Sequence, residues 1–581
     1  MEKLNKIIKQ IKENKWIHYA IIVIIGIILS IPLCKIQIRD THDGFLHLLR
    51  MIGTNNTFKI GEFPPIVAPY YCNGGGYAMN LFYNPLVTYV PLLIKLFTPT
   101  YAMALKVFAS LCIVLSGITM YHFVLQVTKK RTIALFAAII YLISPYKLGD
   151  VYKRYAIGEF ASFIFMPLLF IGMYNLFNEE GKKHYFIAIG AIGLMLTHTV
   201  TTFYMAMFCA LYVLLNIKKL KEKEVIKKLI INAIFIVLIS LFFLAPMLEA
   251  KMSAEYAIFD SEIMSTNGDY VFANTLNLSE FFVDIGEENA TTYIIGVPIF
   301  VLMCLTIFTY KHVDKKYKEF YIICMLFSFI SLYMSSKYCP WSIFPDFFCK
   351  LQYPWRMMGF FAFFISFVIG INIYVLLKIL FNKDLTRLII ITLLTIVMVW
   401  YTIPILLQYE TQDYNIDEFY TNKVLENPYV YHMSINRDYL PTKALVLQRT
   451  YLKERNYKKI YVLEGNVSVQ DEEVKDLSMS ANIVTCEKGT ILEFPFFYYP
   501  GYEITLEKDG DMVELESVES KNGFVSAIIK EDISDARIVI EYKGTIITYA
   551  SYTISFISLI IFTVYIIKQK DWLNKVCYNS K

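Results

Sequence analysis

Ionisable side chains suited to acid–base chemistry gather early in the chain. Asp43, His47 and Arg50 are spaced i, i+4 and i+7, which places all three on one face of a helix. A carboxylate beside a histidine and an arginine can be held ionised and aimed as a general base. The same spacing also suits a capped helix with a local ion pair, and the pattern alone leaves both interpretations open.

Aromatic and glycine-rich motifs follow in the same region. Three glycines at 74–76 lie between Tyr71 and Tyr77, and Tyr83 follows within the motif at 80–85. Glycines let a backbone approach a ligand closely, and tyrosine rings offer faces on which a sugar can stack. A flexible turn is the alternative interpretation. The glycine run lacks the lysine and helix of a P-loop, which argues against nucleotide binding.

Two later motifs add charged residues beside apolar stretches. The first holds Arg154 and Glu159, and the second holds Arg356, preceded by Gln352 and Trp355. A lone ion pair at a membrane boundary is usually structural, but the guanidinium fork also matches phosphate oxygens.

His198 lies between two apolar segments, where a lone histidine is more often structural. An ion pathway would place carboxylates in the middle of membrane crossings, and these crossings are almost free of them. The combined pattern therefore favours a ligand that carries both a lipid phosphate and a sugar.

The composition indicates the class of protein whose elements position these side chains. Of 581 residues, 56% are hydrophobic and 18% are charged, whereas about 25% charged is usual for soluble proteins. The mean hydropathy is +0.47. The net charge of +5, from 55 basic and 50 acidic residues, argues against a nucleic-acid partner. The chain is predicted to be a polytopic α-helical membrane protein.

Apolar stretches long enough to cross a bilayer need about 20 residues, and the sequence predicts about twelve of them. They lie near 17–36, 101–127, 132–147, 158–177, 184–199, 200–217, 228–248, 292–310, 319–336, 357–380, 386–408 and 546–567. Basic connectors alternate with outer segments, so the positive-inside rule predicts that both termini are cytoplasmic.

One further apolar stretch, 84–98, is short and contains Pro85 and Pro91. Counted as a crossing, it would invert the side of every later basic loop. We therefore expect a re-entrant or interfacial helix there.

The domain organisation follows from this topology. Residues 1–408 form a transmembrane domain with a large first outer loop at 37–83, and 546–581 hold the final helix and a cytoplasmic tail. Between them, 409–545 contain alternating apolar and polar runs separated by turn signals at 500–501, 509–510 and 522–523. This pattern predicts an extracytoplasmic β-sandwich.

The ten cysteines show no metal-ligand spacing. Cys339 and Cys349 bracket one outer loop, where a disulfide is compatible with the sequence if the geometry allows it.

Taken in order, these motifs resemble the bacterial YfhO-type and 6-pyruvoyl-tetrahydropterin-synthase-related membrane proteins, which are similar to the GT-C class of membrane glycosyltransferases. The resemblance covers nearly the whole chain. Its motifs are Asp43–His47–Arg50, 61–65, 82–85, Arg154 with Glu159, His198, 352–356, 438–441, 498–502 and 542–545.

The resemblance implies an inverting glycosyltransferase with a polyprenyl-phosphate-sugar donor and its catalytic acidic residue in the first outer loop. Asp43 would be the general base, with Asp40 as its rival, and His47 would orient it or meet the phosphate. The donor phosphate would be bound by Arg50, Arg154 and Arg356. The substrate-binding residues would be Glu159, His198, Tyr71, Tyr77, Tyr83, Gln352 and Trp355.

Some members of the GT-C class use a divalent metal, but this sequence offers no convincing ligand set, so no metal or other cofactor is expected. The expected location is the bacterial cell membrane with an extracytoplasmic active site. The acceptor would be a cell-envelope glycan or a teichoic-acid-type polymer. The alternative is a transporter or flippase, or a non-catalytic assembly protein, for lipid-linked glycans.

Overall fold

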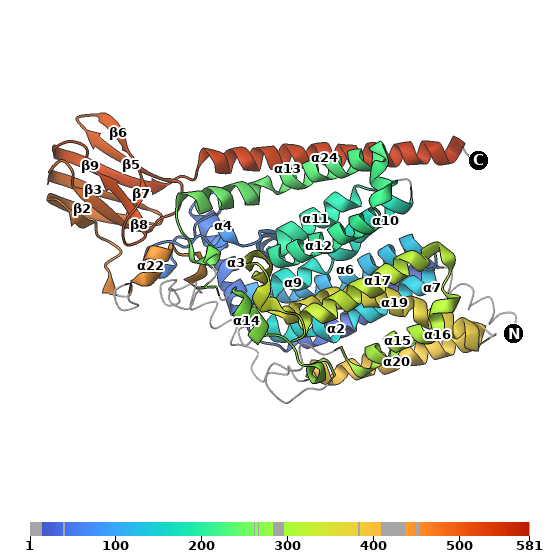
Figure 1. Cartoon of the computed structure of the whole chain (residues 1–581). Helices are drawn as coiled ribbons and strands as arrows, with labels where there is room; N and C mark the ends of the chain where they lie inside the picture. The colour runs from blue at the N-terminus through green and yellow to red at the C-terminus, as the bar shows by residue number, and fades with distance from the viewer. Residues whose placement is uncertain are drawn as a thin grey trace.

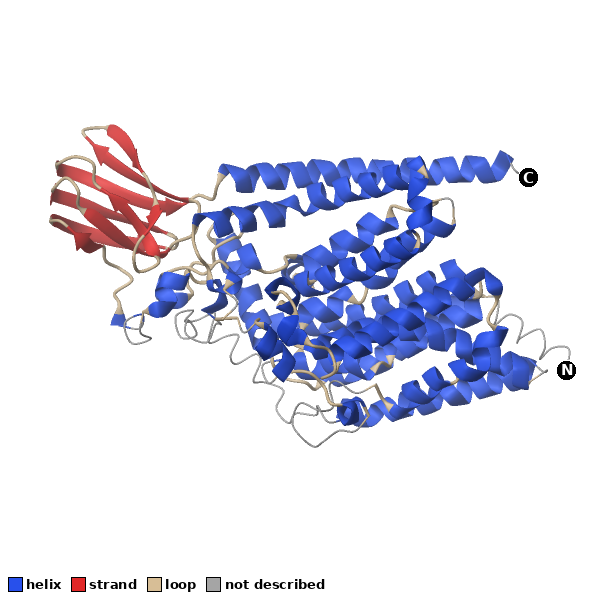
Figure 2. Ribbon diagram, in the orientation of Figure 1, coloured by secondary structure: helices blue, strands red, loops and turns tan. Residues whose placement is uncertain are grey.

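The computed structural model describes residues 14–38, 41–179, 181–260, 262–264, 266–282, 295–381, 384–407, 437–447, 452 and 454–579. Long helices run side by side in a bundle, and a region of β-sheet projects from one end of it (Figures 1 and 2). We call this the sheet-bearing end. The helix that carries the C-terminus, α24 (Ile546–Asn579), starts beside the sheets and runs to the opposite end of the bundle.

Seven helical segments are long and apolar enough to cross a membrane. They are α2 with η1 (Lys15–Cys34), α6 (Tyr101–Thr128), α9 with α10 (Ile157–Asn178), α13 (Lys223–Ser253), α17 (Lys315–Ser335), η11 with α19 (Pro354–Leu380) and α24 over Ile546–Gln569. An eighth span is formed if α7 (Arg131–Leu142) and the segment Pro145–Arg154, bent by 45°, are counted as one.

The other four predicted crossings correspond to shorter apolar helices. These are α11 (Phe186–Thr197), α12 (Thr199–Leu215), the segment Val297–His312, and the apolar part of α20 (Asp384–Leu407). At 1.5 Å per residue, the 12 residues of α11 extend about 18 Å, less than the roughly 30 Å of a hydrocarbon core. The polytopic fold is confirmed, whereas the count of twelve crossings stays a prediction beyond the seven or eight long spans.

The proline-containing stretch forms α5 (Leu86–Lys95), a helix of only 10 residues with Pro91 inside it. It packs against α6 and against α3 (Gly44–Lys59). Just beyond its end, Leu96 and Phe97 are 75% and 87% exposed. A short helix that ends in exposed apolar side chains fits an interfacial position, and it is too short to cross.

The predicted β-region contains two antiparallel sheets with strand orders β1-β4-β8-β7 and β2-β3-β9-β5-β6. The strands are β1 (Tyr461–Glu464), β2 (Val467–Lys475), β3 (Ser478–Cys486), β4 (Ile491–Phe497), β5 (Tyr502–Lys508), β6 (Asp511–Leu515), β7 (Val518–Glu519), β8 (Phe524–Ile528) and β9 (Ile533–Tyr542). All three predicted turns lie next to or between strands, and Gly510 adopts φ +90° in the β5–β6 hairpin. The β-rich region is confirmed, and a face-to-face sandwich stays our interpretation.

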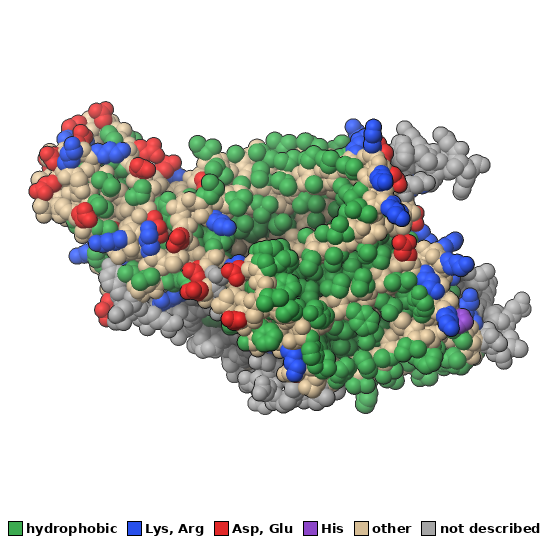
Figure 3. All heavy atoms as spheres, viewed as in Figure 1, with side chains coloured by type: hydrophobic (Ala, Val, Ile, Leu, Met, Phe, Trp, Pro, Cys, Tyr) green, Lys and Arg blue, Asp and Glu red, His purple; other side chains and the backbone are tan. Residues whose placement is uncertain are grey.

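Short elements complete the sheet-bearing end. They are α4 (Met79–Phe82), α8 (Pro145–Gly149), η4 (Asp150–Arg154), α14 (Gly268–Ala273), α18 (Asp346–Cys349), η13 (Arg437–Tyr439) and α22 (Thr442–Val446). Apolar side chains cover most of the bundle surface in Figure 3, and lysines and arginines gather at the end opposite the sheets. This distribution agrees with the positive-inside rule if that end is cytoplasmic.

We predict that the sheet-bearing end faces the outside of the cell, and introduced cysteines can test this orientation. In intact cells, a membrane-impermeant maleimide should label Asp509→Cys, in the β5–β6 turn. It should label Lys219→Cys, in the basic η5 segment (Ile217–Lys221), only after permeabilisation. The wild-type protein reports labelling of the native thiols. Labelling of Lys219→Cys alone in intact cells would mean that the molecule is inserted the other way round.

Candidate functional site

A distorted turn near the sheet-bearing end positions two of the predicted site residues, Arg154 and Glu159. The segment η4 (Asp150–Arg154) is a π-helical turn, and Tyr155 after it has left-handed backbone dihedrals with φ 50°. Such dihedrals cost a non-glycine residue about 1 kcal/mol or more, and π-helical turns occur frequently at functional sites.

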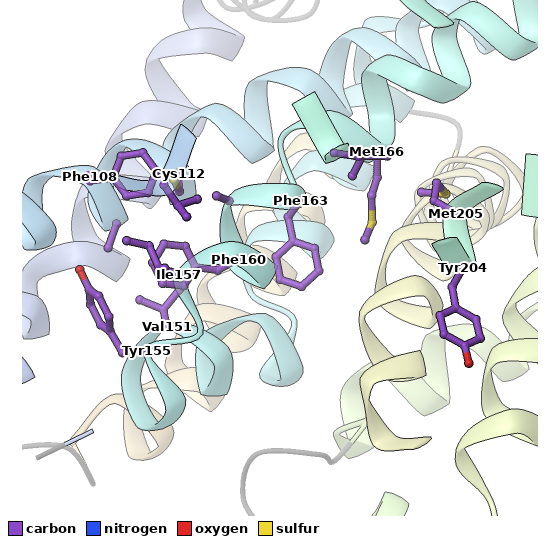
Figure 4. Packing of buried hydrophobic residues seen from close by; sticks show 14 of the residues in the cluster. Phe108, Cys112, Val151, Tyr155, Ile157, Phe160, Phe163, Met166, Tyr204 and Met205 are labelled. Carbon is purple, nitrogen blue, oxygen red and sulfur yellow. The ribbon is translucent and has the colours of Figure 1, made fainter. Parts of the chain in front are cut away.

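Packing holds this turn in place. The rings of Tyr155 and Phe160 meet edge to face at 5.5 Å, and Phe108 of α6 lies 6.4 Å from Phe160 (Figure 4). All three side chains are buried. The turn is therefore anchored to α6 and α9 by apolar contacts.

A buried ion network occupies the turn. One guanidinium nitrogen of Arg154, NH1, contacts Asp150 Oδ1 and lies 2.9 Å from Glu159 Oε2. Glu159 also lies 3.7 Å from Arg356 Nε and accepts a hydrogen bond from the Tyr146 hydroxyl. We call Asp150, Arg154, Glu159 and Arg356 the charge cluster. Because the first three are at most 4% exposed, each charge depends on the others for compensation.

The segment before α19 completes the cluster. Arg356 NH1 donates to Leu351 O at 2.9 Å and to Gln352 Oε1 at 3.1 Å. The indole of Trp355 stacks on the Tyr353 ring at 4.9 Å, and the Arg154 guanidinium lies 4.4 Å from the centre of the Trp355 ring. This cation–π contact adds to the compensation of the Arg154 charge.

The first predicted motif lies directly against this turn. The backbone N–H of Asp43 donates to Arg154 O at 2.9 Å. Asp43 is half-buried at the start of α3, and its carboxylate accepts no hydrogen bond from the first turn of that helix, which is fully described. It interacts electrostatically with Asp150 and Arg154. Asp43 therefore presents a carboxylate near the charge cluster that its own helix does not engage.

His47 and Arg50 form a buried pair on α3. His47 Nδ1 lies 3.0 Å from Arg50 NH1, and the guanidinium lies 3.5 Å from the centre of the Tyr83 ring. Burial lowers the pKa of His47 well below its usual range, and the Arg50 charge lowers this pKa further. The imidazole is therefore neutral at physiological pH and can accept a hydrogen bond from Arg50. The predicted clustering of this motif on one helical face is confirmed for His47 and Arg50.

Two nitrogens of Arg50, Nε and Nη2, take no part in the contact with His47. Arg50 is 1% exposed, and its Nε and Nη2 atoms make no hydrogen bond that meets normal geometry with any described residue. The hydroxyls of Tyr83 and of Tyr439, from η13, nevertheless lie within hydrogen-bonding reach of the Arg50 guanidinium. A buried guanidinium with N–H groups left over is unfavourable unless an acceptor reaches it.

A close helix contact brings His198 to the same place. A side chain at Gly158 would lie 2.6 Å from Thr197 O, 3.2 Å from the His198 ring and 3.3 Å from the Tyr83 hydroxyl. Glycine at this position lets α9 approach Thr197, His198 and the Tyr83 hydroxyl closely. His198 itself caps α12, with Nδ1 2.7 Å from Thr201 Oγ1.

The structure thus brings together most of the predicted site residues. These are Asp43, His47, Arg50, Tyr83, Arg154, Glu159, His198, Gln352, Trp355 and Arg356. Asp40, the rival base, lies outside the described residues.

Tyr71 and Tyr77 are placed in packing contacts instead. Tyr71 is 2% exposed and donates to Leu49 O at 2.8 Å, and Tyr77 is 1% exposed and stacks on Tyr439 at 5.5 Å. Gly75 O accepts a hydrogen bond from Phe497 N at 2.8 Å, so the glycine run packs against the β-region. Neither tyrosine presents a free face to a ligand in this structure, and their predicted role in substrate binding remains untested.

Cys339 and Cys349 are buried free thiols, so the disulfide that the sequence left open is not formed in the structure. Among the described residues, no three His, Cys, Asp or Glu side chains come together as a metal-binding group.

Sequence reasoning missed three members of the site. Asp150 precedes Arg154 by four residues, a helical spacing that offered a usable signal. Tyr146 belongs to an ordinary apolar segment, and Tyr439 lies in the motif 438–441, which the sequence related to the β-region and not to the site; their contacts with Glu159 and Arg50 carry no local signature.

Long apolar helices around a buried charge cluster, with β-sheets at the same end, define a polytopic membrane protein with a site at one end of its bundle. Residues 74–431 match the profile of a family described as bacterial membrane protein YfhO, more than half of the chain. The chain belongs to this family, which confirms the YfhO-type resemblance and a bacterial membrane location.

An uncharacterized protein of Lactococcus lactis subsp. cremoris (strain MG1363) is 28% identical over 352 residues, which are 59% of this chain and 57% of that protein. The chain thus aligns with little more than half of this relative's length. Among solved structures, it is similar to the archaeal oligosaccharyltransferase AglB from Archaeoglobus fulgidus, in complex with an inhibitory peptide and a dolichol-phosphate. The TM-score is 0.37 at 12% identity, covering 68% of this chain and 56% of that one.

We predict that removing the buried charge of Arg154 destabilises the protein much more than removing the exposed charge of Lys129. Arg154→Met should destabilise the protein by about 3–5 kcal/mol, because it leaves Asp150 and Glu159 buried without their main partner. Lys129→Met removes the exposed pair with Glu179 and should cost about 1 kcal/mol or less. Thermal unfolding of both variants in the same detergent measures the difference. Equal melting temperatures would contradict a stabilising role for the cluster.

Proposed function

We propose that this protein is an inverting membrane glycosyltransferase of the GT-C type, which transfers a sugar from a polyprenyl-phosphate donor to an extracytoplasmic acceptor of the cell envelope. One observation carries the proposal: Asp43, whose carboxylate α3 does not engage, and Arg50, which interacts only with neutral groups among the described hydrogen-bond partners (His47, Tyr83 and Tyr439), share one helix beside the charge cluster. A general base and an anion ligand are the two groups that this transfer requires.

The three predicted phosphate ligands differ in how far their charges are already compensated. Arg154 contacts two buried carboxylates, and Arg356 contacts Glu159, a carbonyl and an amide oxygen. Arg50 Nη1 faces a neutral histidine, and the other described groups within hydrogen-bonding reach of its guanidinium are the neutral hydroxyls of Tyr83 and Tyr439. We therefore assign donor-phosphate binding chiefly to Arg50, with Arg154 and Arg356 as positioning residues.

The same comparison selects the base. Asp150 and Glu159 are buried and each contacts the Arg154 guanidinium, so an acceptor hydroxyl from outside the bundle does not reach them as readily as it reaches a half-buried carboxylate. Asp43 is half-buried, and its backbone is tied to Arg154 O, which holds its position while its carboxylate stays available. An available carboxylate held by its backbone is suited to accept a proton from an acceptor hydroxyl.

In the proposed reaction, Asp43 accepts the acceptor hydroxyl proton as that oxygen bonds to the anomeric carbon. The bond from this carbon to the donor phosphate oxygen breaks at the same time, and the released phosphate takes the bonding electrons. Arg50 stabilises the negative charge that develops there. His47 acts as a positioning residue, because its neutral Nδ1 accepts from Arg50 NH1 and fixes the plane of the guanidinium. Attack opposite the leaving group inverts the configuration, and no cofactor takes part.

The base assignment predicts that Asp43→Asn abolishes transfer, because an amide cannot accept the proton. In a strain that carries only this variant, mass spectrometry of envelope polymers should show loss of one sugar decoration at unchanged protein level. Asp269→Asn, an exposed aspartate in α14, is the matched control and should keep the decoration.

Wild-type decoration in the Asp43→Asn strain would exclude Asp43 as the base. The alternative function, export of the lipid-linked sugar, predicts donor lipid accumulating on one leaflet in a deletion strain. The proposed transfer predicts unchanged sidedness of that lipid.

The phosphate assignment predicts that Arg50→Gln lowers kcat/KM for the lipid-linked donor by about 10- to 100-fold, the range expected for a lost charged hydrogen bond. Lys443→Gln, which removes a half-exposed surface charge paired with Glu519, is the control and should stay within twofold. Purified protein in nanodiscs with a synthetic donor provides the measurement. An unchanged kcat/KM for Arg50→Gln would remove this residue from the donor site.

A further inference from the structure

The second sheet carries a polar row that the proposed reaction does not use. Hydrogen-bonded registry places Gln470, Asn482, Arg537, Glu507 and Met512 opposite one another across β2, β3, β9, β5 and β6. Four of these are exposed and Glu507 is half-exposed, while their strand neighbours, such as Ile483 and Ile538, are buried. The outward face of this sheet is therefore polar across β2, β3, β9 and β5, with an exposed methionine on β6.

This row lines a hollow of about 600 Å³. The β5–β6 turn contributes Asp509 and Gly510 to its lining, and the start of β9 contributes Asp535. The hollow is open on its outer side, so a ligand held there would stay partly exposed to solvent.

The chemistry of the lining matches carbohydrate hydroxyl groups. Amide, carboxylate and guanidinium side chains offer paired donors or acceptors that can bond to neighbouring hydroxyls. The Asn482 amide donates a hydrogen bond from Nδ2 to Asp471 Oδ2 at 2.9 Å, and its side chain is exposed. Met512 is 74% exposed and offers an apolar surface for the C–H face of a sugar ring.

The charge of the hollow selects among glycans. Its lining holds three carboxylates, from Glu507, Asp509 and Asp535, against the single guanidinium of Arg537. The excess of negative charge repels a polyanion such as a phosphate-linked polymer. A neutral glycan avoids this repulsion and keeps the hydrogen bonds.

The hollow lies apart from the charge cluster. Arg537 is five residues before Tyr542, the last residue of β9 before the connection to α24, so the row lies about 17 Å along the strand from that end of β9. Figure 1 shows the sheets projecting beyond the helices. A single sugar therefore cannot occupy both places.

We propose that this hollow is a binding site for a neutral glycan chain. Its role as the place where the acceptor polymer is held rests on the proposed glycosyltransferase function. This assignment narrows the acceptor from either envelope glycan or teichoic-acid-type polymer to an uncharged polysaccharide.

The test measures binding of polysaccharides to the full chain in nanodiscs by biolayer interferometry. The probes are dextran, a neutral galactan and soluble chitin oligomers, with dextran sulfate as a polyanion on the dextran backbone. We expect binding of at least one neutral probe and none of dextran sulfate. Asn482→Ala and Arg537→Ala, both at exposed positions, should each weaken that binding at least fivefold. Glu514→Gln, an exposed β6 residue outside the hollow, should leave it unchanged.

Absence of binding to every neutral probe, equal binding by Asn482→Ala and Arg537→Ala, or a preference for dextran sulfate would overturn the inference. Asp43→Asn separates it from the proposed function, because this variant should lose transfer and keep polysaccharide binding. Intact transfer without polysaccharide binding refutes the hollow alone. Polysaccharide binding in a wild-type protein that transfers no sugar refutes the proposed function alone.

Discussion

The compensation of Arg154 inside the helical bundle is the constraint on which the site depends. A guanidinium removed from water needs opposite charge and hydrogen-bond acceptors, and Arg154 obtains them from Asp150, Glu159 and the face of Trp355. These partners come from η4, α9 and the segment before α19, so their segments must meet at one point. The π-helical turn and the left-handed Tyr155 are the backbone distortions that this meeting requires.

The degree to which each arginine charge is balanced by buried carboxylates distinguishes Arg154 and Arg356 from Arg50, the arginine proposed to bind a ligand. Because Arg154 and Arg356 are engaged with carboxylates and carbonyl oxygens, their charge is largely balanced before any ligand arrives. Arg50 lies on α3, outside the charge cluster, and contacts a neutral imidazole and an aromatic ring. An aromatic face and a neutral acceptor stabilise a cation without cancelling its charge. The attraction of this site for an anion therefore concentrates at Arg50.

The β-region contributes to the site as well as projecting from it. Its connecting segment brings Tyr439 to Arg50 and to Tyr77, and the Gly75 carbonyl is bonded to Phe497 of β4. The first loop after α2 is thereby held between the bundle and the sheets. Gly75 permits this contact, since a Cβ atom at this position would lie 2.8 Å from the Phe497 ring.

The sequence by itself determined that the chain is a membrane protein. It also determined the long apolar spans, the β-rich region with its three turns, and most of the residues that meet at the site. These features depend on local composition and on spacings of a few residues, which hydropathy and helix periodicity capture. Whether the shorter apolar stretches cross depends on segment length against bilayer thickness, and periodicity does not measure this.

Only the tertiary structure decided which arginine is compensated, that Arg356 joins Glu159, and that Tyr71 and Tyr77 are packed rather than open. It also aligned the polar row across the second sheet, because registry depends on pairings between distant segments. The physical reason is common to all of these. The charge state and exposure of a side chain depend on neighbours that are tens to hundreds of residues away in the chain, and packing alone brings them within a few ångströms.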